Sequence, residues 1–272
     1  MLLPLVFLLD LDNTIIGDAS SQVCRYEISK YTKTKHDTAE LTYELQSGLL
    51  RPHFESFIKY VKTRYDGVEI YIFTAAERKW ANVIISVLEK HLDIKFNRPI
   101  FSREYCVPEN GILQKQIGKI APKLYRCLKS KYGLTHISQL KKQVVLIDNN
   151  VVINDHDLHR FIKCPNYDYY VPCDVLMGVS KRSIQKYIQN VGAILSKYGI
   201  IQGSPNGTDY QRLLSHYYNN VSDIFKQGAS QANKNRKDID NFWLTVERIF
   251  RNHNIKSFNT KVVSYINKNV GI

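Results

Sequence analysis

Cysteine is scarce in this sequence, and its spacing fits neither a metal module nor a disulfide framework. The five cysteines are scattered at positions 24, 106, 127, 164 and 173, with no Cys-x-x-Cys pair. Zinc-binding modules and disulfide-rich secreted domains are therefore excluded as the basis of the fold. Free thiols in this pattern are typical of a reducing compartment, so we expect an intracellular protein, either nuclear or cytoplasmic.

Long apolar runs are also absent. The opening run, Leu2 to Leu9, contains Pro4, lacks a basic flank and ends directly at Asp10. These features indicate a buried strand and not a secretory signal. No other segment approaches the roughly 18 apolar residues of a membrane span. We therefore expect a chain that is neither secreted nor attached to a membrane.

Acidic residues are few relative to basic ones, and the net charge is +13. Residues 175–272 hold 14 Lys and Arg against 5 Asp and Glu, a net charge of +9. This charge could serve to bind nucleic acid or an acidic protein at residues 176–272, but a solvated basic face is the preferred interpretation. The basic residues concerned are Lys234, Arg236, Lys237, Arg248, Arg251, Lys256 and Lys261.

Short apolar runs alternate with helical patterns along the first part of the chain. The apolar runs, at 5–9, 68–73 and 144–147, predict parallel strands that are buried on both faces. The helical patterns lie at 54–64, 78–91 and 119–132. The alternation predicts an α/β fold with a doubly wound, Rossmann-like parallel sheet.

The chain is expected to divide near residue 175. Residues 1–175 form the α/β domain, with a polar insertion at 17–50 that is either a flap beside the site or a surface loop. Residues 176–272 form a helical C-terminal extension, with helices expected at 183–198, 209–226, 238–252 and 261–267. Apolar residues at helical spacing predict packing of these helices together or onto the sheet; they include Ile239, Phe242, Trp243, Val246, Ile249 and Phe250.

Polar residues follow each of the three predicted strands. Asp10, Thr74 and Asp148 stand at these positions, and parallel strands bring their carboxyl ends to one edge of a sheet. After the first strand comes Asp10-Leu11-Asp12-Asn13-Thr14. Phosphoryl transfer needs a nucleophilic oxygen, a proton donor for the leaving group and a cation, and two neighbouring carboxylates can supply the first two roles.

The strand followed by Asp-x-Asp-x-Thr resembles the first motif of the haloacid dehalogenase (HAD) superfamily of phosphohydrolases. Within it the sequence is most similar to the phosphatases of the RNA polymerase II C-terminal domain, also called NLI-interacting-factor-like phosphatases. The resemblance implies a HAD-like fold, Asp10 as nucleophile and Asp12 as general acid and base. Aspartate is also common in structural turns, so the motif has meaning only together with others in the right order.

Three further stretches resemble motifs of the same family. Residues 70–75 resemble the second motif, which implies that Thr74 binds the phosphate. Arg103-Glu104-Tyr105-Cys106 and the residues after it resemble the third, which implies that Lys115 binds phosphate, with Lys119 and Lys123 as alternatives. Residues 144–150 resemble the fourth, which implies Mg²⁺ binding by Asp148 and Asn149 together with Asp10 and Asp12.

Two residues are candidates for a substrate groove. Arg51 opens the segment Arg51-Pro52-His53, which resembles a family motif before the second strand. Trp80 lies where related phosphatases often have an aromatic residue, although packing within its helix is an equal alternative. The sequence departs from the family pattern at Asn13, Gln116 and Asn150.

Together these features predict an Mg²⁺-dependent phosphomonoester hydrolase that forms an aspartyl-phosphate intermediate. The substrate implied by the resemblance is phosphoserine or phosphothreonine on a protein, with the RNA polymerase II C-terminal domain as the candidate. Two alternatives stay open, because a fold does not choose a substrate. One is a phosphatase for nucleotides, small molecules or nucleic-acid ends, and the other is a transcription-associated scaffold that binds nucleic acid through its basic helical region.

Overall fold

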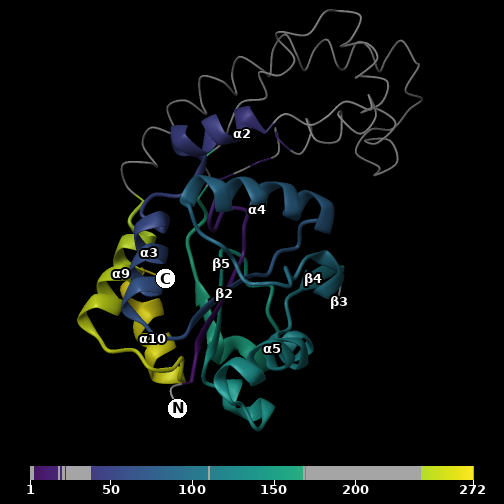
Figure 1. Ribbon diagram of the computed structural model, residues 1–272, viewed down its shortest axis with the longest axis vertical. Helices are drawn as coiled ribbons and strands as arrows, with labels where there is room; N and C mark the ends of the chain where they lie inside the picture. Colours follow the sequence, from purple (N-terminus) through teal and green to yellow (C-terminus); the bar gives the residue numbers. More distant parts are fainter. Residues whose placement is uncertain are drawn as a thin grey trace, which may run out of the picture.

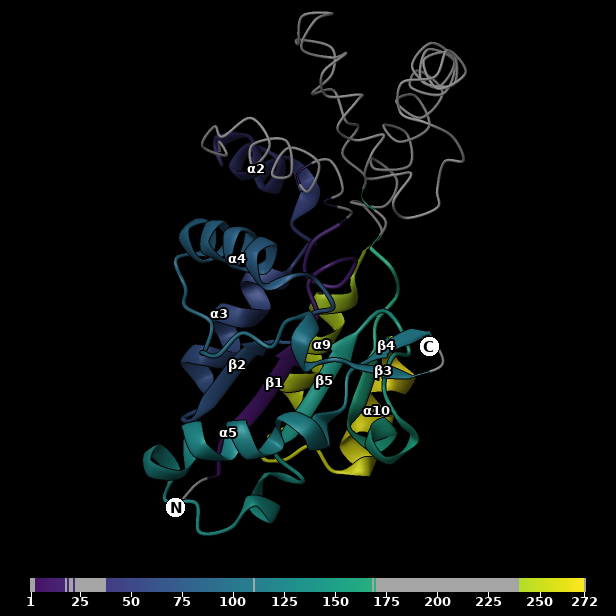
Figure 2. The same ribbon diagram turned by 90° about the vertical axis from the view of Figure 1, so that its right-hand side faces the viewer.

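The fold is built on four parallel strands. The computed structural model describes residues 3–17, 19, 22, 38–109, 111–167, 169 and 240–271. Within them the sheet has the order β2-β1-β5-β6, and its strands lie side by side in Figure 2. Their bounds are β1 Leu5–Leu9, β2 Val68–Ile72, β5 Val144–Asp148 and β6 Phe161–Lys163. The predicted α/β fold with a parallel sheet is confirmed.

The central strand β1 is buried along its whole length, which explains its uninterrupted apolar sequence. Leu9 pairs with Ile72 of β2 on one side and with Ile147 of β5 on the other. Successive side chains of a strand point to opposite faces, so Phe7 belongs to one hydrophobic cluster and Val6 to another. Both faces of the sheet therefore need a cover of helices.

Helix α5 (Ile117–Tyr132) covers one face. Its buried side chains recur every three or four residues, as expected of an amphipathic helix, and they are Ile117, Ile120, Leu124 and Leu128. The helix ends at Gly133, where a φ of 59° places the backbone in the left-handed region that glycine adopts without strain. The same side chains pack against Val6 and Leu8 of β1.

Helices from both ends of the chain cover the opposite face. They are α3 (Phe54–Arg64), α4 (Arg78–Leu92), α9 (Phe242–Asn252) and α10 (Thr260–Asn269), and α3, α9 and α10 lie together in Figure 1. Phe7 of β1 contacts the rings of Phe250 and Phe258, with centroids 5.7 and 5.1 Å away. Residues 240–271 therefore share one hydrophobic core with the sheet, and the expected boundary at 175 lies outside the described residues.

Shorter elements connect this framework. Helix α2 (Ala39–Glu44) continues into the π-helical turn η1 (Leu45–Leu49), and an antiparallel hairpin joins β3 (Val107–Glu109) to β4 (Ile112–Gln114). Short 3₁₀ turns are η2 (Arg103–Tyr105), η3 (Ile137–Leu140) and η4 (Asp155–Arg160). Most of the expected insertion, the expected helices at 183–198 and 209–226, and Lys234, Arg236 and Lys237 lie outside the described residues.

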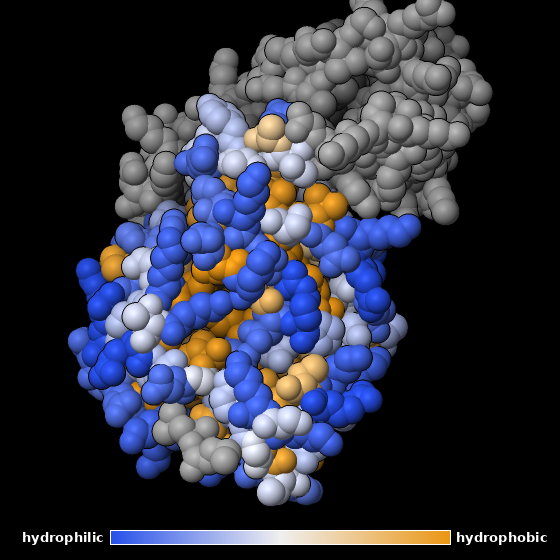
Figure 3. All heavy atoms as spheres, viewed as in Figure 1, coloured by the Kyte–Doolittle hydropathy of each residue, from blue (hydrophilic) through white to orange (hydrophobic). Residues whose placement is uncertain are grey.

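One face of the described part is mainly hydrophilic (Figure 3). Figure 3 shows hydrophilic side chains over most of one face, with hydrophobic ones visible mainly near its middle. None of the helices in the described ranges has the length and apolar character needed to cross a bilayer.

Candidate active site

Three polar residues meet at the carboxyl edge of the sheet. Asp10 follows β1, Asp148 ends β5, and Thr74 comes two residues after β2. The backbone N–H of Asp10 donates to the carbonyl of Ile147, at 3.1 Å, which holds Asp10 beside β5. Because β1 lies between β2 and β5, Asp10 lies between the other two residues.

Lys115 joins two of the strand ends. Its Nζ donates to Asp10 Oδ1 at 2.5 Å and to Asp148 Oδ2 at 2.6 Å, and only 1% of the residue is exposed. Its backbone N–H donates to the carbonyl of Val152, which fixes the segment that carries it. Of the three lysines considered from the sequence, the structure places Lys115 in the site, whereas Lys119 is exposed on α5.

Burial shapes the protonation of this cluster. Loss of hydration raises the pKa of Asp10 to about 7, the charge of Lys115 opposes this rise, and the charges of Asp148 and Asp12 add to it. Burial alone would lower the pKa of Lys115, but the two carboxylates that it contacts raise it above its ordinary value. Lys115 is therefore a permanent cation, and Asp10 keeps its negative charge only with help from nearby positive charge.

A tight turn follows Asp10. The carbonyl of Leu11 accepts the N–H groups of Thr14, Ile15 and Ile16 at 3.2, 2.9 and 3.1 Å. Asn13 has a φ of 57°, in the left-handed region that asparagine tolerates better than most residues. Asp12 is partly exposed, unlike the buried Asp10. The turn therefore holds the Asp10 carboxylate in the interior and leaves Asp12 partly accessible to solvent.

A buried network links this turn to the end of β5. The Thr14 hydroxyl donates to Asn149 Oδ1 at 3.2 Å and accepts the backbone N–H of Asn149 at 3.1 Å. The side-chain amide of Asn149 donates to Asn166 Oδ1 at 3.0 Å. Asn149 is thereby oriented through its backbone N–H and through both the oxygen and the nitrogen of its side-chain amide.

Thr74 occupies the third strand end, with 1% of its surface exposed. Its backbone N–H donates to the carbonyl of Phe101 at 2.8 Å, and its hydroxyl accepts the N–H of Ala76 at 3.1 Å. These contacts fix both the backbone and the hydroxyl beside the other strand ends.

The two groove candidates are buried. Trp80 is 6% exposed and belongs to the hydrophobic cluster of α4, which favours the packing alternative. Arg51 is 1% exposed and binds the carboxylate of Asp240 through Nε and Nη2. Their burial does not favour direct contact with a substrate.

Arg103 is a further candidate for substrate binding. It belongs to a family-like motif, but the sequence alone predicts no role for it. Its Nε donates to the carbonyl of Ala75 at 2.8 Å, next to Thr74, and about half of its side chain is exposed. Its Nη1 lies 3.6 Å from Glu77 Oε1. The guanidinium is therefore a solvent-accessible positive charge that η2 holds against the loop carrying Thr74. Its signal in the sequence was the segment Arg103-Glu104-Tyr105-Cys106.

The donor set suits a hard cation. Carboxylate and amide oxygens of Asp10, Asp148 and Asn149 are the ligand types that Mg²⁺ prefers. Asp10 and Asp148 share the one ammonium group of Lys115, so this trio has two carboxylates for one cation, and a divalent cation would offset the difference. Among the described residues no group of three or more His, Cys, Asp or Glu side chains forms a metal site. Mg²⁺ would therefore also use backbone, substrate and water ligands, as it commonly does.

Comparisons with solved structures give similarities of low identity. Fcp1, an essential RNA polymerase II CTD phosphatase, matches with 16% identity and a TM-score of 0.39, over 97% of this chain and 70% of that chain. A fission yeast Fcp1 variant bound to beryllium fluoride matches with 14% identity and a TM-score of 0.38, over the same shares. A phosphoserine phosphohydrolase-like protein from Francisella tularensis subsp. tularensis SCHU S4 matches with 16% identity and a TM-score of 0.29, over 65% of this chain and 93% of that chain.

The family assignment rests on a comparison with protein-family models. No curated protein matches the chain. The model of the NLI interacting factor-like phosphatases matches residues 5–191, which contain every strand of the sheet and all the strand-end residues described above. The chain belongs to the NLI interacting factor-like phosphatase family and is a HAD-type phosphatase.

Proposed function

We propose that this phosphatase is an Mg²⁺-dependent phosphomonoester hydrolase in which Asp10 is the nucleophile. The observation that carries the proposal is the position of Lys115, whose buried ammonium group binds both Asp10 and Asp148 at the carboxyl edge of the sheet. A permanent cation beside a buried carboxylate lowers the pKa that burial raises and so favours the ionised carboxylate, and it also offsets the charge of an incoming phosphate.

The reaction has two steps. A carboxylate oxygen of Asp10 attacks phosphorus, the bond to the leaving oxygen breaks, and Asp12 gives its proton to that oxygen. Asp12 then takes a proton from water, which attacks the aspartyl phosphate and releases inorganic phosphate and the free Asp10 carboxylate. The partial exposure of Asp12 supports this role, because it must reach the leaving group and water in turn.

The other strand-end residues bind the phosphoryl group and the cation. Thr74 contributes its fixed hydroxyl and Lys115 its charge to the phosphate oxygens. Asp10, Asp148, Asn149 and the backbone carbonyl of Asp12 would hold Mg²⁺, with Asp148 also orienting Lys115. When bound, the cation supplies charge neutralisation at the phosphoryl oxygens.

We propose phosphoserine or phosphothreonine on a protein as the substrate, with the RNA polymerase II C-terminal domain as the first candidate. Two exposed apolar residues support a peptide: Ile112 of the β3–β4 hairpin and Val151, each 57% exposed. Both lie within three residues of a site residue, Lys115 or Asp148. Exposed apolar side chains close in sequence to the charged site residues suit a peptide better than a small polar phosphate ester.

Hydrolysis of an aryl phosphate tests the chemistry. We expect activity with Mg²⁺, loss of activity with EDTA, and no activity in Asp10→Asn that retains the wild-type circular dichroism spectrum. A well-folded wild type with no activity under these conditions would contradict the proposed reaction.

A panel under identical Mg²⁺ tests the substrate. It compares phosphoserine and phosphothreonine peptides with nucleotides and with 5′- and 3′-phosphorylated oligonucleotides. We expect the highest kcat/KM for a phosphopeptide. A preference for oligonucleotides would overturn the choice of substrate while leaving the chemistry intact.

A further inference from the structure

The turn after Asp10 is held by side chains that are distant in sequence. Arg51 Nη1 donates to the carbonyls of Asn13 and Thr14, at 3.3 and 3.4 Å. The indole N–H of Trp243 donates to the same Thr14 carbonyl at 3.2 Å, across 229 positions of sequence. The backbone that connects Asp12 to Thr14 is therefore bound from outside the turn.

Asp240 fixes the guanidinium of Arg51. Arg51 Nε lies 3.0 Å from Asp240 Oδ1, and Nη2 lies 2.8 Å from Oδ2, so the pair is bidentate. The side chain of Arg51 is fully buried, and the ring of Phe242 packs against it at 4.8 Å from the centroid. A buried guanidinium that loses its carboxylate has an uncompensated charge and must rearrange or draw in water. Asp240 thus determines where Arg51 points.

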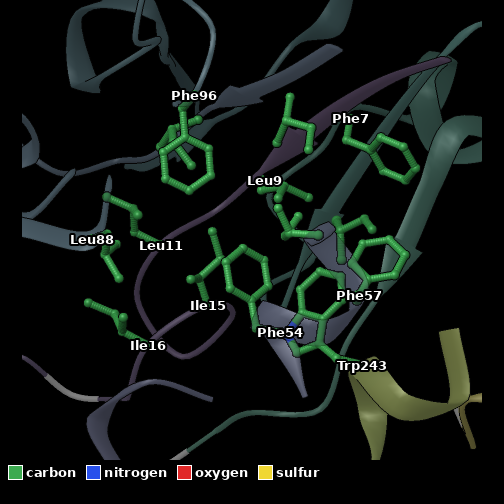
Figure 4. Close-up of a cluster of buried hydrophobic side chains, with 14 of the residues drawn as sticks. Phe7, Leu9, Leu11, Ile15, Ile16, Phe54, Phe57, Leu88, Phe96 and Trp243 are labelled. Atoms are coloured by element: carbon green, nitrogen blue, oxygen red, sulfur yellow. The ribbon is translucent and has the colours of Figure 1, made fainter. Parts of the chain in front are cut away.

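Packing fixes the indole of Trp243. Its ring stacks on Phe57, with centroids 5.0 Å apart and planes at 25°, and it meets the edge of Phe54 at 5.1 Å. Figure 4 shows these three rings together. Trp243 is fully buried, and its N–H is directed at the carbonyl of Thr14.

We propose that Asp240 and Trp243 are positioning residues for the phosphatase reaction, acting on Asp10 and Asp12 through the turn at residues 13–15. Asp240 acts through Arg51, which binds the carbonyls of Asn13 and Thr14, whereas Trp243 binds the Thr14 carbonyl directly. The Thr14 hydroxyl then binds Asn149. This inference rests on the proposed function. Both residues lie beyond residue 191, where the match to the family model ends, so that match assigns them no part in catalysis.

The effect on rate follows from the geometry of phosphoryl transfer. In-line attack requires the nucleophile, the proton donor and the phosphate to be aligned closely, and a shift of about 1 Å can lower a rate by about 100-fold. Substrate affinity depends less on the turn, since Thr74 and Lys115 are held by other segments. Loss of positioning therefore lowers kcat more than it raises KM.

Three variants of the full chain separate positioning from stability. Asp240→Asn removes the charge that orients Arg51, and Trp243→Phe retains an aromatic ring but removes the N–H. Glu247→Gln is the matched control on α9, because Glu247 accepts hydrogen bonds from Ser56 and Arg251, at 2.6 and 2.7 Å, and none from the turn. It therefore weakens the docking of α9 without contacting residues 13–15.

We expect kcat for an aryl phosphate to fall about 10- to 100-fold in Asp240→Asn and about fivefold in Trp243→Phe, with KM within about twofold of wild type. Glu247→Gln should keep the wild-type kcat even where its melting temperature is lower. If Asp240→Asn does not fold, the kcat of Trp243→Phe alone tests the proposal. A wild-type kcat in Trp243→Phe, or an equal fall in Glu247→Gln, would overturn the proposal.

Backbone amide exchange gives a readout that does not need turnover. The Asn149 amide donates to the Thr14 hydroxyl, so it should exchange faster in Asp240→Asn and Trp243→Phe and at the wild-type rate in Glu247→Gln. Unchanged exchange in all three variants would contradict the proposal. If the wild type is inactive but the variants show these exchange differences, the proposed reaction is wrong, whereas the coupling of Asp240 and Trp243 to the turn at residues 13–15 still holds.

Discussion

Thr14 and Asn149 hold each other by two hydrogen bonds across 135 positions of sequence. One side chain belongs to the turn after β1 and the other residue directly follows β5, so the pair joins the loops of two neighbouring strands at the site. The Thr14 hydroxyl both donates and accepts, and no other small side chain except serine can do this.

Replacement of Thr14 by valine should remove both bonds without changing the volume of the side chain. The buried N–H and amide oxygen of Asn149 would lose a partner, so we expect a loss of about 1–3 kcal/mol in the free energy of unfolding and a lower kcat. Urea unfolding and aryl phosphate kinetics measure the two effects. Thr14→Ser retains the hydroxyl and is the control, and equal behaviour of the two variants would contradict this role.

Asp10→Asn should be inactive and more stable than wild type at neutral pH. Burial raises the pKa of Asp10 to about 7, so its ionisation destabilises the folded state above the unfolded value of 3.8. The stability advantage of the variant should grow as the pH rises from about 4 to about 7 and then level off, reaching on the order of 2–4 kcal/mol. Melting temperatures in metal-free buffer test this trend, and a variant less stable than wild type at pH 8 would contradict it.

Lys115→Met should abolish activity and destabilise the fold. It leaves the carboxylates of Asp10 and Asp148 buried together without their shared cation, at a cost of about 3–5 kcal/mol. Protonation of one carboxylate relieves the repulsion, so the loss should be greater at pH 8 than at pH 6. Lys119→Met, at an exposed position of α5, is the control and should resemble wild type in activity and stability.

Binding of Mg²⁺ should strengthen as the pH rises from 6 to 8. A carboxylate must lose its proton to bind the cation, and the pKa of Asp10 lies at about 7. We expect the dissociation constant to fall up to about tenfold per pH unit below 7 and to change little above it, with proton release visible by calorimetry in buffers of different ionisation enthalpy. Asp10→Asn should lack this dependence, and an equally steep dependence in that variant would assign the proton to another group.

Arg103→Ala should affect a phosphopeptide more than an aryl phosphate. The guanidinium is accessible and is anchored to the carbonyl beside Thr74, so it can contact parts of a substrate outside the phosphoryl group. We expect KM for a phosphopeptide to rise about 10- to 100-fold, the effect of losing one hydrogen bond to a charged group, with aryl phosphate kinetics unchanged. Arg98→Ala, which alters an ion pair with Glu89, is the control.

Local patterns were sufficient to predict three of the four strands of the sheet, whereas the short strand β6 was not predicted. A strand buried on both faces has a continuous apolar sequence, and β1 was predicted with its observed bounds, as was α3. The placement of Lys115 beside Asp10 was expected from the resemblance to the family, because the first motif contains Asp10 and the third implies Lys115, although 105 positions separate them.

Contacts between residues that are far apart in the sequence could not be predicted from it. Arg51 was considered for a substrate groove because the segment Arg51-Pro52-His53 resembles a family motif. It is buried here, where arginine is seldom found, and Asp240 pairs with it from 189 positions away. Nothing in the local sequence of either residue signals the other. Trp80 shows the same limit, since an aromatic residue on an amphipathic helix has the same spacing whether it faces a core or a groove.

The cover of Phe7 by Phe250 and Phe258 has a consequence for biosynthesis. The central strand is made before α9 and α10, yet one of its faces cannot be fully covered until residues 240–271 have left the ribosome. Until then a nascent chain exposes an apolar sheet surface, which is the kind of surface that chaperones recognise and that aggregates when left unprotected. A ribosome stalled before α9 should therefore hold a chain that is bound by chaperones and sensitive to protease, and one stalled well after α10 should hold a folded enzyme.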